Sequence, residues 1–138
     1  MMAPVDKGFE YSASPARVLV IEEDETHAQG IVAGLESAGH CACTIANSRA
    51  RGAALIENDV FDVVLADFKM ADVDGLAILR KVKERLPDAE VILMTGHASI
   101  NSAIAAMQGG AYAYLTKPLD IHEVRAAVDK ASGRRRGD

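Results

Sequence analysis

The sequence predicts an α/β fold in which a doubly wound, five-stranded parallel sheet is flanked by five helices. Short runs of branched apolar residues, such as Val18–Ile21, are typical of strands covered on both faces. Between these runs, apolar residues recur at spacings of three and four, which indicates amphipathic helices. Because strands and helices alternate along the chain, we expect parallel strands joined by right-handed crossovers.

Turn and capping residues mark where the helices begin and end. Ser48 suits the N-cap of the second helix, and Gly39 is placed to end the first. Pro87 stops the third helix, and Gly109–Gly110 closes the fourth. The strands are expected at residues 18–21, 41–45, 61–66, 91–94 and 111–115, and the helices from Thr26, Ser48, Gly75, Ser99 and about Asp120.

Length and composition predict one globular domain. The chain has 138 residues, of which 49% are hydrophobic and 25% charged, so a single core is expected. Residues 1–16 lack periodicity and are expected to be a disordered leader. Residues 17–131 form the domain, and residues 132–138 are a polar, basic tail or linker stub. Cys41 and Cys43 are expected to be small buried apolar residues rather than part of a disulfide framework.

Charge and hydropathy exclude two classes of partner. The net charge of −5 opposes direct binding of nucleic acid by this chain. No apolar run approaches the roughly 18–20 residues that cross a bilayer, and residues 1–16 lack the apolar core of a signal peptide. We therefore expect a cytoplasmic protein with no membrane partner.

Polar residues follow four of the five expected strands. Ligands in such folds bind at the carboxyl ends of the strands. Taken singly, each residue has a structural explanation, such as an acidic start or a cap for the next helix. The residues are Glu22–Glu25 after the first strand, Asp67 after the third, Thr95 after the fourth and Lys117–Pro118 after the fifth.

Together these residues form one chemically coherent group. Gathered carboxylates need a cation to offset their repulsion, and Mg2+ takes hard oxygen ligands while leaving positions for phosphate oxygens. Lys117 adds a positive charge, and Thr95 adds a hydrogen-bond donor. This equipment suits in-line phosphoryl transfer to the Asp67 carboxylate, because that reaction depends on charge neutralisation and positioning.

The motifs resemble the receiver domains of two-component response regulators. Asp67 precedes Thr95 by 28 residues and Lys117 by 50, as in that family. The resemblance covers about residues 17–131 and implies the flavodoxin-like strand order 2-1-3-4-5. The sequence around Met94–His97 and Leu119–Asp120 is similar to that of the nitrogen-regulator subgroup. The segments that carry the resemblance are Val18-Leu-Val-Ile-Glu-Glu-Asp24, Val64-Leu-Ala-Asp-Phe-Lys-Met70 with Val73-Asp-Gly75, Val91-Ile-Leu-Met-Thr-Gly96 and Tyr114-Leu-Thr-Lys-Pro118.

The resemblance implies a regulatory phosphoacceptor that catalyses only its own phosphorylation and dephosphorylation. Asp67 would take the phosphoryl group from a sensor histidine kinase or a phosphotransfer protein. Thr95 and Lys117 would contact that group, Thr95 and Tyr114 would form the switch, and the Lys117–Pro118 bond would be cis. A partner or a second copy would bind the face made by the fourth helix, the fifth strand and the fifth helix.

The resemblance also implies a metal site for Mg2+ or Mn2+ and two residues that tune dephosphorylation. The side chains of Lys69 and His97 would influence the water that hydrolyses the acyl phosphate. Gly96 would leave space for the phosphoryl donor. The implied metal ligands are Glu22, Glu23, Asp24, Asp67 and the backbone carbonyl of Lys69.

Two positions depart from the family's pattern. The acidic pair is usually Asp-Asp or Glu-Asp, whereas a gap-free alignment selects Glu22–Glu23 and a shift of one residue selects Glu23–Asp24. The longer glutamate side chain would alter metal affinity. Ala71–Asp72 replaces the usual Pro-Gly, which predicts a more mobile and more negative loop. The remaining histidines, His27, His40 and His122, are interpreted as ordinary surface or helix residues.

Other functions fit the sequence less well. A haloacid-dehalogenase-type phosphatase would carry a second aspartate where Lys69 stands. A flavin carrier would need a phosphate loop after the first strand, which Glu22–Glu25 would repel. The remaining alternative is a receiver-like interaction module that works without phosphorylation.

Overall fold

The computed structural model describes residues 14–68 and 75–133 and confirms the predicted α/β fold. In these residues, five parallel strands form one sheet in the order β2-β1-β3-β4-β5. The strands are β1 (Ala16–Ile21), β2 (Cys41–Ala46), β3 (Val63–Asp67), β4 (Glu90–Thr95) and β5 (Ala113–Thr116). The helices are α2 (Glu25–Glu36), α3 (Arg49–Asn58), α4 (Gly75–Arg85), α5 (Ile100–Gln108) and α6 (Ile121–Ser132).

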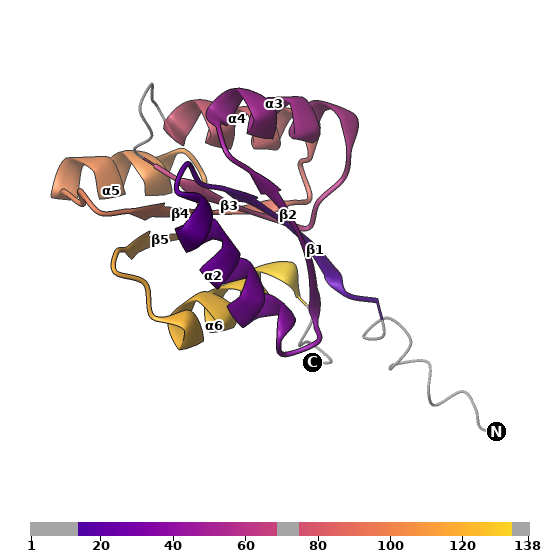
Figure 1. The fold of residues 1–138 in the computed structure, drawn as a ribbon. Coiled ribbons are helices and arrows are strands. Elements are labelled where there is room, and N and C mark those ends of the chain that lie inside the picture. The colour runs from indigo at the N-terminus through magenta and orange to yellow at the C-terminus, as the bar shows by residue number, and fades with distance from the viewer. Residues whose placement is uncertain (1–13, 69–74, 134–138) are drawn as a thin grey trace.

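Alternate side chains of the strands enter two cores on opposite faces of the sheet. On β3, Val64 and Ala66 pack with buried residues of α3, α4 and α5, whereas Val63 and Leu65 pack with those of α2 and α6. Figure 1 shows the two groups of helices on opposite sides of the sheet. Both faces of the central strands are therefore covered, which explains their continuous apolar sequences.

Capping residues start the helices close to the carboxyl ends of the strands. The Asp24 side chain accepts a hydrogen bond from the His27 N–H at the start of α2. Ser48, Ser99 and Asp120 cap α3, α5 and α6 in the same manner. Helix α2 ends at Glu36, and Gly39 lies in the following turn with a φ of +81°, a conformation that favours glycine.

Strand boundaries differ from the expected ones by a few residues, because pairing sets them and apolar character does not. The sheet begins at Ala16, which is buried and pairs with Cys41. Phe61 lies before β3 and packs into the core as part of the connecting loop. Cys41 and Cys43 are free thiols that are half-buried rather than fully buried. Burial, with smaller effects from Cys41 and Glu36, raises the pKa of Cys43 to about 12.

Candidate functional site

The carboxyl edge of the sheet brings together the polar residues that end β3 and β4 and those that follow β1 and β5. Glu22, Asp67 and Thr95 are the buried polar side chains in the described residues, with 2%, 9% and 0% of their surface exposed. The Lys117 N–H donates to the Thr95 carbonyl at 2.8 Å, so Lys117 continues the β4–β5 ladder past the end of β5. Glu22 and Lys117, which are 95 residues apart in the chain, therefore meet at this edge.

The Lys117 ammonium lies between two carboxylates. Its Nζ donates to Asp67 Oδ2 and to Glu22 Oε1, each at 2.8 Å. Burial lowers the pKa of Lys117, but the hydrogen bonds with Asp67 and Glu22 outweigh it, and the pKa lies above its ordinary value. The Lys117–Pro118 peptide bond is cis. A fixed positive charge is thus held against a buried carboxylate at the end of β3.

Both carboxylate oxygens of Glu22 accept hydrogen bonds. Oε1 accepts from Lys117 and lies 2.9 Å from His27 Nδ1, and Oε2 accepts from the Asp24 N–H at 3.0 Å. Burial alone would raise the pKa of Glu22. The bonds from Lys117, Asp24 and His27 reverse that effect, and the pKa lies below its ordinary value. Glu22 is therefore an ionised, buried anchor for Lys117.

Glu23 and Asp24 lie outside this buried cluster. Both are exposed, and the Asp24 side chain is occupied in capping α2. Glu22 is the acidic residue of this run whose carboxylate lies in the buried cluster. Lys69 and the Ala71–Asp72 departure lie outside the described residues.

Thr95 ends β4 and is fully buried. Its Oγ1 accepts a hydrogen bond from the His97 N–H at 2.9 Å, which leaves the hydroxyl hydrogen to donate elsewhere. His97 itself is exposed. A Cβ atom added to Gly96 would lie 3.9 Å from Cβ and Cδ of Lys117, so residue 96 borders the aliphatic part of that side chain.

Tyr114 lies on β5 and is half-buried. Its ring packs edge-on against Phe68, with ring centres 6.0 Å apart and planes at 73°. The Tyr114 hydroxyl forms a hydrogen bond with the Ser102 hydroxyl on α5. Tyr114 therefore connects the residue after Asp67 to the first turn of α5.

His27 is the site residue that sequence reasoning missed, because it was interpreted as an ordinary helix residue. Its place in the first turn of α2, five residues after Glu22, was the available signal. In a helix that starts directly at the end of β1, that turn lies beside the residues at the strand end.

The donor chemistry of the site suits a hard cation. Asp67 and Glu22 supply buried carboxylate oxygens, and Glu23 stands next to them at the exposed edge. Within residues 14–68 and 75–133, no three His, Cys, Asp or Glu side chains form a group that would hold a metal alone. A bound Mg2+ would therefore take further oxygen ligands from water, phosphate or the main chain.

The chain matches a known protein family. The family model of the response regulator receiver domain matches residues 18–129. The chain belongs to this family. The receiver domain is a regulatory domain, and two curated relatives support the nitrogen-regulator-like subgroup. The DNA-binding transcriptional regulator NtrC of Salmonella typhimurium is 39% identical over 83% of this chain, and the transcriptional regulatory protein ZraR of Escherichia coli K12 is 36% identical over 83%. The match covers 24% of NtrC and 26% of ZraR, so this receiver chain spans about a quarter of their length.

Solved receiver structures share the fold. A CheY-like receiver domain from Methanospirillum hungatei has a TM-score of 0.81 at 28% identity, covering 91% of this chain and 100% of its own. The beryllofluoride-activated NtrC4 receiver domain dimer has 0.77 at 32%, covering 83% and 94%. A Burkholderia pseudomallei response regulator with a phosphorylated aspartic acid, calcium ion and citrate has 0.77 at 28%, covering 88% and 71%.

Within the described residues, every helix is too short or too polar to cross a bilayer.

Proposed function

We propose that this receiver domain accepts a phosphoryl group on Asp67 and relays the signal through a switched surface. The donor would be a sensor histidine kinase or a phosphotransfer protein in the cytoplasm. One observation carries the proposal: Lys117 Nζ lies 2.8 Å from Asp67 Oδ2 at the carboxyl edge of the sheet. This is the place and the charge arrangement that phosphoryl transfer to a carboxylate requires.

The chemistry is an in-line displacement. A carboxylate oxygen of Asp67 forms a bond to phosphorus while the bond from phosphorus to the donor's histidine nitrogen breaks, and the imidazole keeps the electron pair. Lys117 stabilises the negative charge that gathers on the phosphoryl oxygens, and the Thr95 hydroxyl donates a hydrogen bond to one of them. Gly96 keeps the approach beside Lys117 open.

Magnesium fits this site, with Mn2+ as a substitute. Asp67 and Glu23 would supply ligands directly, with the main-chain carbonyl of Lys69, and Glu22 would contribute through its hold on Lys117. When bound, the metal neutralises phosphoryl charge and orients the donor. The Burkholderia structure pairs a phosphorylated aspartic acid with a calcium ion, which supports a divalent cation beside the acceptor.

The acceptor is tested by labelling. Acetyl phosphate or phosphoramidate with Mg2+ should add one base-labile phosphoryl group, measured by intact mass, and Asp67→Asn should abolish it. Asp62→Asn is the matched control, because Asp62 lies before β3 and its carboxylate binds the Arg17 N–H instead. Unchanged labelling of Asp67→Asn would refute the assignment.

The same experiment decides the second candidate, an interaction module that works without phosphorylation. The observation that favours it is the saturation of Glu22, whose two oxygens are occupied by Lys117, His27 and Asp24. A wild-type protein that takes no phosphoryl group at high Mg2+ and shows no beryllofluoride response would establish that alternative.

The output surface would be the face made by α5, β5 and α6. Thr95 and Tyr114 connect the acceptor to it, because Thr95 leads into α5 and Tyr114 lies on β5 against Ser102 of α5. The NtrC4 relative is a beryllofluoride-activated dimer, which supports a second copy as one partner of an activated receiver. His97, exposed two residues after Thr95, and Lys69 would tune dephosphorylation.

A further inference from the structure

The His27 side chain reaches from α2 into the charged cluster of the site. Its Nδ1 lies 2.9 Å from Glu22 Oε1, the oxygen that also accepts from Lys117 Nζ at 2.8 Å. His27 keeps 32% of its side chain exposed, whereas that of Glu22 is 3% exposed. A chain of contacts therefore runs from α2 through Glu22 and Lys117 to Asp67.

The direction of the hydrogen bond follows from the acceptor. An ionised carboxylate only accepts, so Nδ1 of His27 carries the hydrogen and donates to Glu22. The neutral tautomer with hydrogen on Nδ1 and the imidazolium both make this bond. The contact is thus independent of the charge on the ring.

His27 is held at two points. Its main-chain N–H donates to Asp24 Oδ1 at 3.0 Å as part of the α2 cap, and its ring donates to Glu22. The cap fixes the turn that carries the ring, and this turn starts at Glu25, shortly after β1 ends at Ile21. The Asp24 N–H holds Oε2 of Glu22 and the His27 ring holds Oε1, the oxygen that faces Lys117.

We propose that His27 is a positioning residue for phosphoryl transfer, which aligns Glu22 so that Lys117 stays against Asp67. The inference rests on the proposed phosphoacceptor function. Partners that orient the residues around a metal or phosphoryl site commonly change affinity or rate by about 10–100-fold when removed. Removal of the His27 ring should act at that scale, because His27 orients the Glu22 carboxylate that holds Lys117 beside Asp67.

The kinetic test compares His27→Leu with His27→Asn. Phosphorylation by phosphoramidate is followed over a range of Mg2+ concentrations. His27→Leu should lower the rate at limiting Mg2+ about tenfold. His27→Asn should recover most of it, because the amide donates from nearly the position of Nδ1. In a Glu22→Ala background, His27→Leu should have no further effect, since the carboxylate that His27 contacts is absent.

His122→Leu is the matched control, because His122 also lies in the first turn of a helix and is exposed. It should phosphorylate at the wild-type rate. Equal rates for wild type and His27→Leu would overturn the inference, and so would a loss in His27→Leu that persists undiminished in the Glu22→Ala background.

A second readout needs neither metal nor phosphate. The side-chain 15N resonance of Lys117, assigned by its loss in Lys117→Arg, should move in metal-free His27→Leu and return in His27→Asn. An unchanged Lys117 resonance in His27→Leu would overturn the inference. A wild-type protein that takes no phosphoryl group would count against the proposed function, and the Lys117 resonance would still decide the role of His27.

Discussion

Burial separates the acidic residues after β1 into different roles. Glu22 is inside the site and binds Lys117, whereas Asp24 is exposed and caps α2. Glu23 lies between them at the exposed edge. The same functional group therefore serves as an anchor, a cap and a candidate metal ligand, according to which way each residue points from the end of the strand.

This division predicts which carboxylates affect metal binding. Glu23→Gln should weaken Mg2+ binding about tenfold, at the lower end of the usual range for loss of a site group. Glu23→Asp should retain or improve it, and Glu22→Gln should weaken it through displacement of Lys117. Asp24→Asn should bind as the wild type does, because asparagine caps a helix as well as aspartate. Titration followed by NMR shifts measures the affinities, and sensitivity to Asp24→Asn alone would favour the Glu23–Asp24 register.

The lowered pKa of Glu22 predicts a pH dependence of the metal-free protein. A carboxyl whose pKa is lower in the folded state stabilises the fold above its unfolded pKa, about 4.3 for glutamate, and loses that contribution as the pH falls through the folded pKa. At pH 7 the free energy of unfolding of the wild type should exceed that of Glu22→Gln by about 1.5–3 kcal/mol, the usual value of hydrogen bonds to a charged group. Urea unfolding should show the two proteins converging in acid, and a constant difference down to pH 2 would contradict this account.

At the scale of elements, the segment from β4 to β5 lies between the proposed acceptor and the proposed output face. Thr95 ends β4, Ser99 caps α5, and Ser102 in the first turn of α5 bonds to the Tyr114 hydroxyl on β5. The Ser102 hydroxyl also donates to the Ser99 carbonyl at 3.1 Å. A displacement of Thr95 toward a phosphoryl group would therefore reach Tyr114 through the start of α5.

Thr95→Ala should uncouple acceptance from switching. The variant should still be phosphorylated, because Asp67 and Lys117 remain, but it lacks the hydroxyl that makes different contacts in the two states. Beryllofluoride should shift the Tyr114 ring resonances in wild type and in the Thr95→Ser control, and much less in Thr95→Ala. A full Tyr114 response in Thr95→Ala would place the coupling elsewhere.

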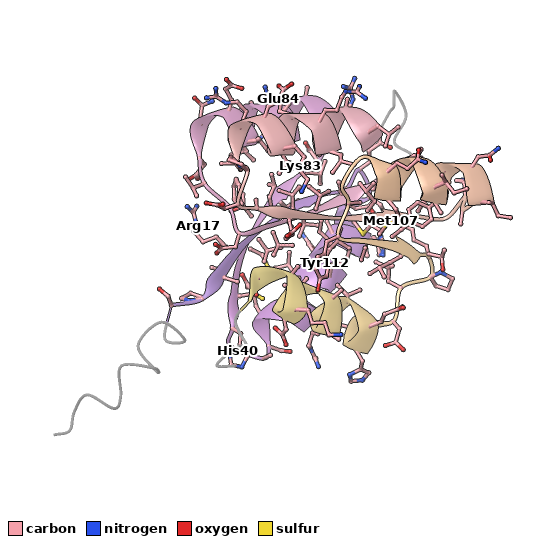
Figure 2. The ribbon with its side chains drawn as sticks, turned by 180° about the vertical axis from the view of Figure 1, so that it is seen from behind. Arg17, His40, Lys83, Glu84, Met107 and Tyr112 are labelled. Carbon is pink, nitrogen blue, oxygen red and sulfur yellow. The ribbon has the colours of Figure 1, made fainter. Side chains whose placement is uncertain are left out.

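At the scale of the whole molecule, apolar side chains are exposed along α5 and ahead of β5. Ile100 is 79% exposed, and Ile104, Met107 and Tyr112 are also exposed. Met107 and Tyr112 are labelled in Figure 2, on α5 and before β5. Clustered apolar exposure of this kind marks interaction surfaces. It lies on the face proposed to change with phosphorylation.

Activation should promote self-association through this face. Sedimentation should show a larger assembly for the beryllofluoride-treated wild type, and Ile104→Glu should prevent it by placing charge in the interface. Val60→Glu is the control, since Val60 is also exposed but lies in the loop that joins α3 to the amino end of the central strand β3. Both substitutions are on the surface and should change the free energy of unfolding by less than about 0.5 kcal/mol. An activated Ile104→Glu that still associates would exclude this face.

The sequence by itself determined the fold class, the helix starts and the residues at the strand ends. Apolar runs such as Val18–Ile21 indicate strands, and residues such as Ser48 indicate helix caps, because both depend on local chemistry. The motifs around Asp67, Thr95 and Lys117 resemble those of the receiver family, and their spacing agrees with that resemblance. Sheet geometry accounts for their meeting, because parallel strands bring their carboxyl ends to one edge.

Only the tertiary structure decided how the side chains meet. It placed the His27 ring beside the Glu22 carboxylate and turned Glu22 inward while Asp24 caps α2. It also left Tyr114 half-buried against Phe68 and Ser102. Glu22 meets Lys117 across 95 residues of sequence. Strand bounds likewise followed pairing partners. Such contacts depend on the relative position of segments distant in the chain, which no local pattern of apolar or capping residues contains.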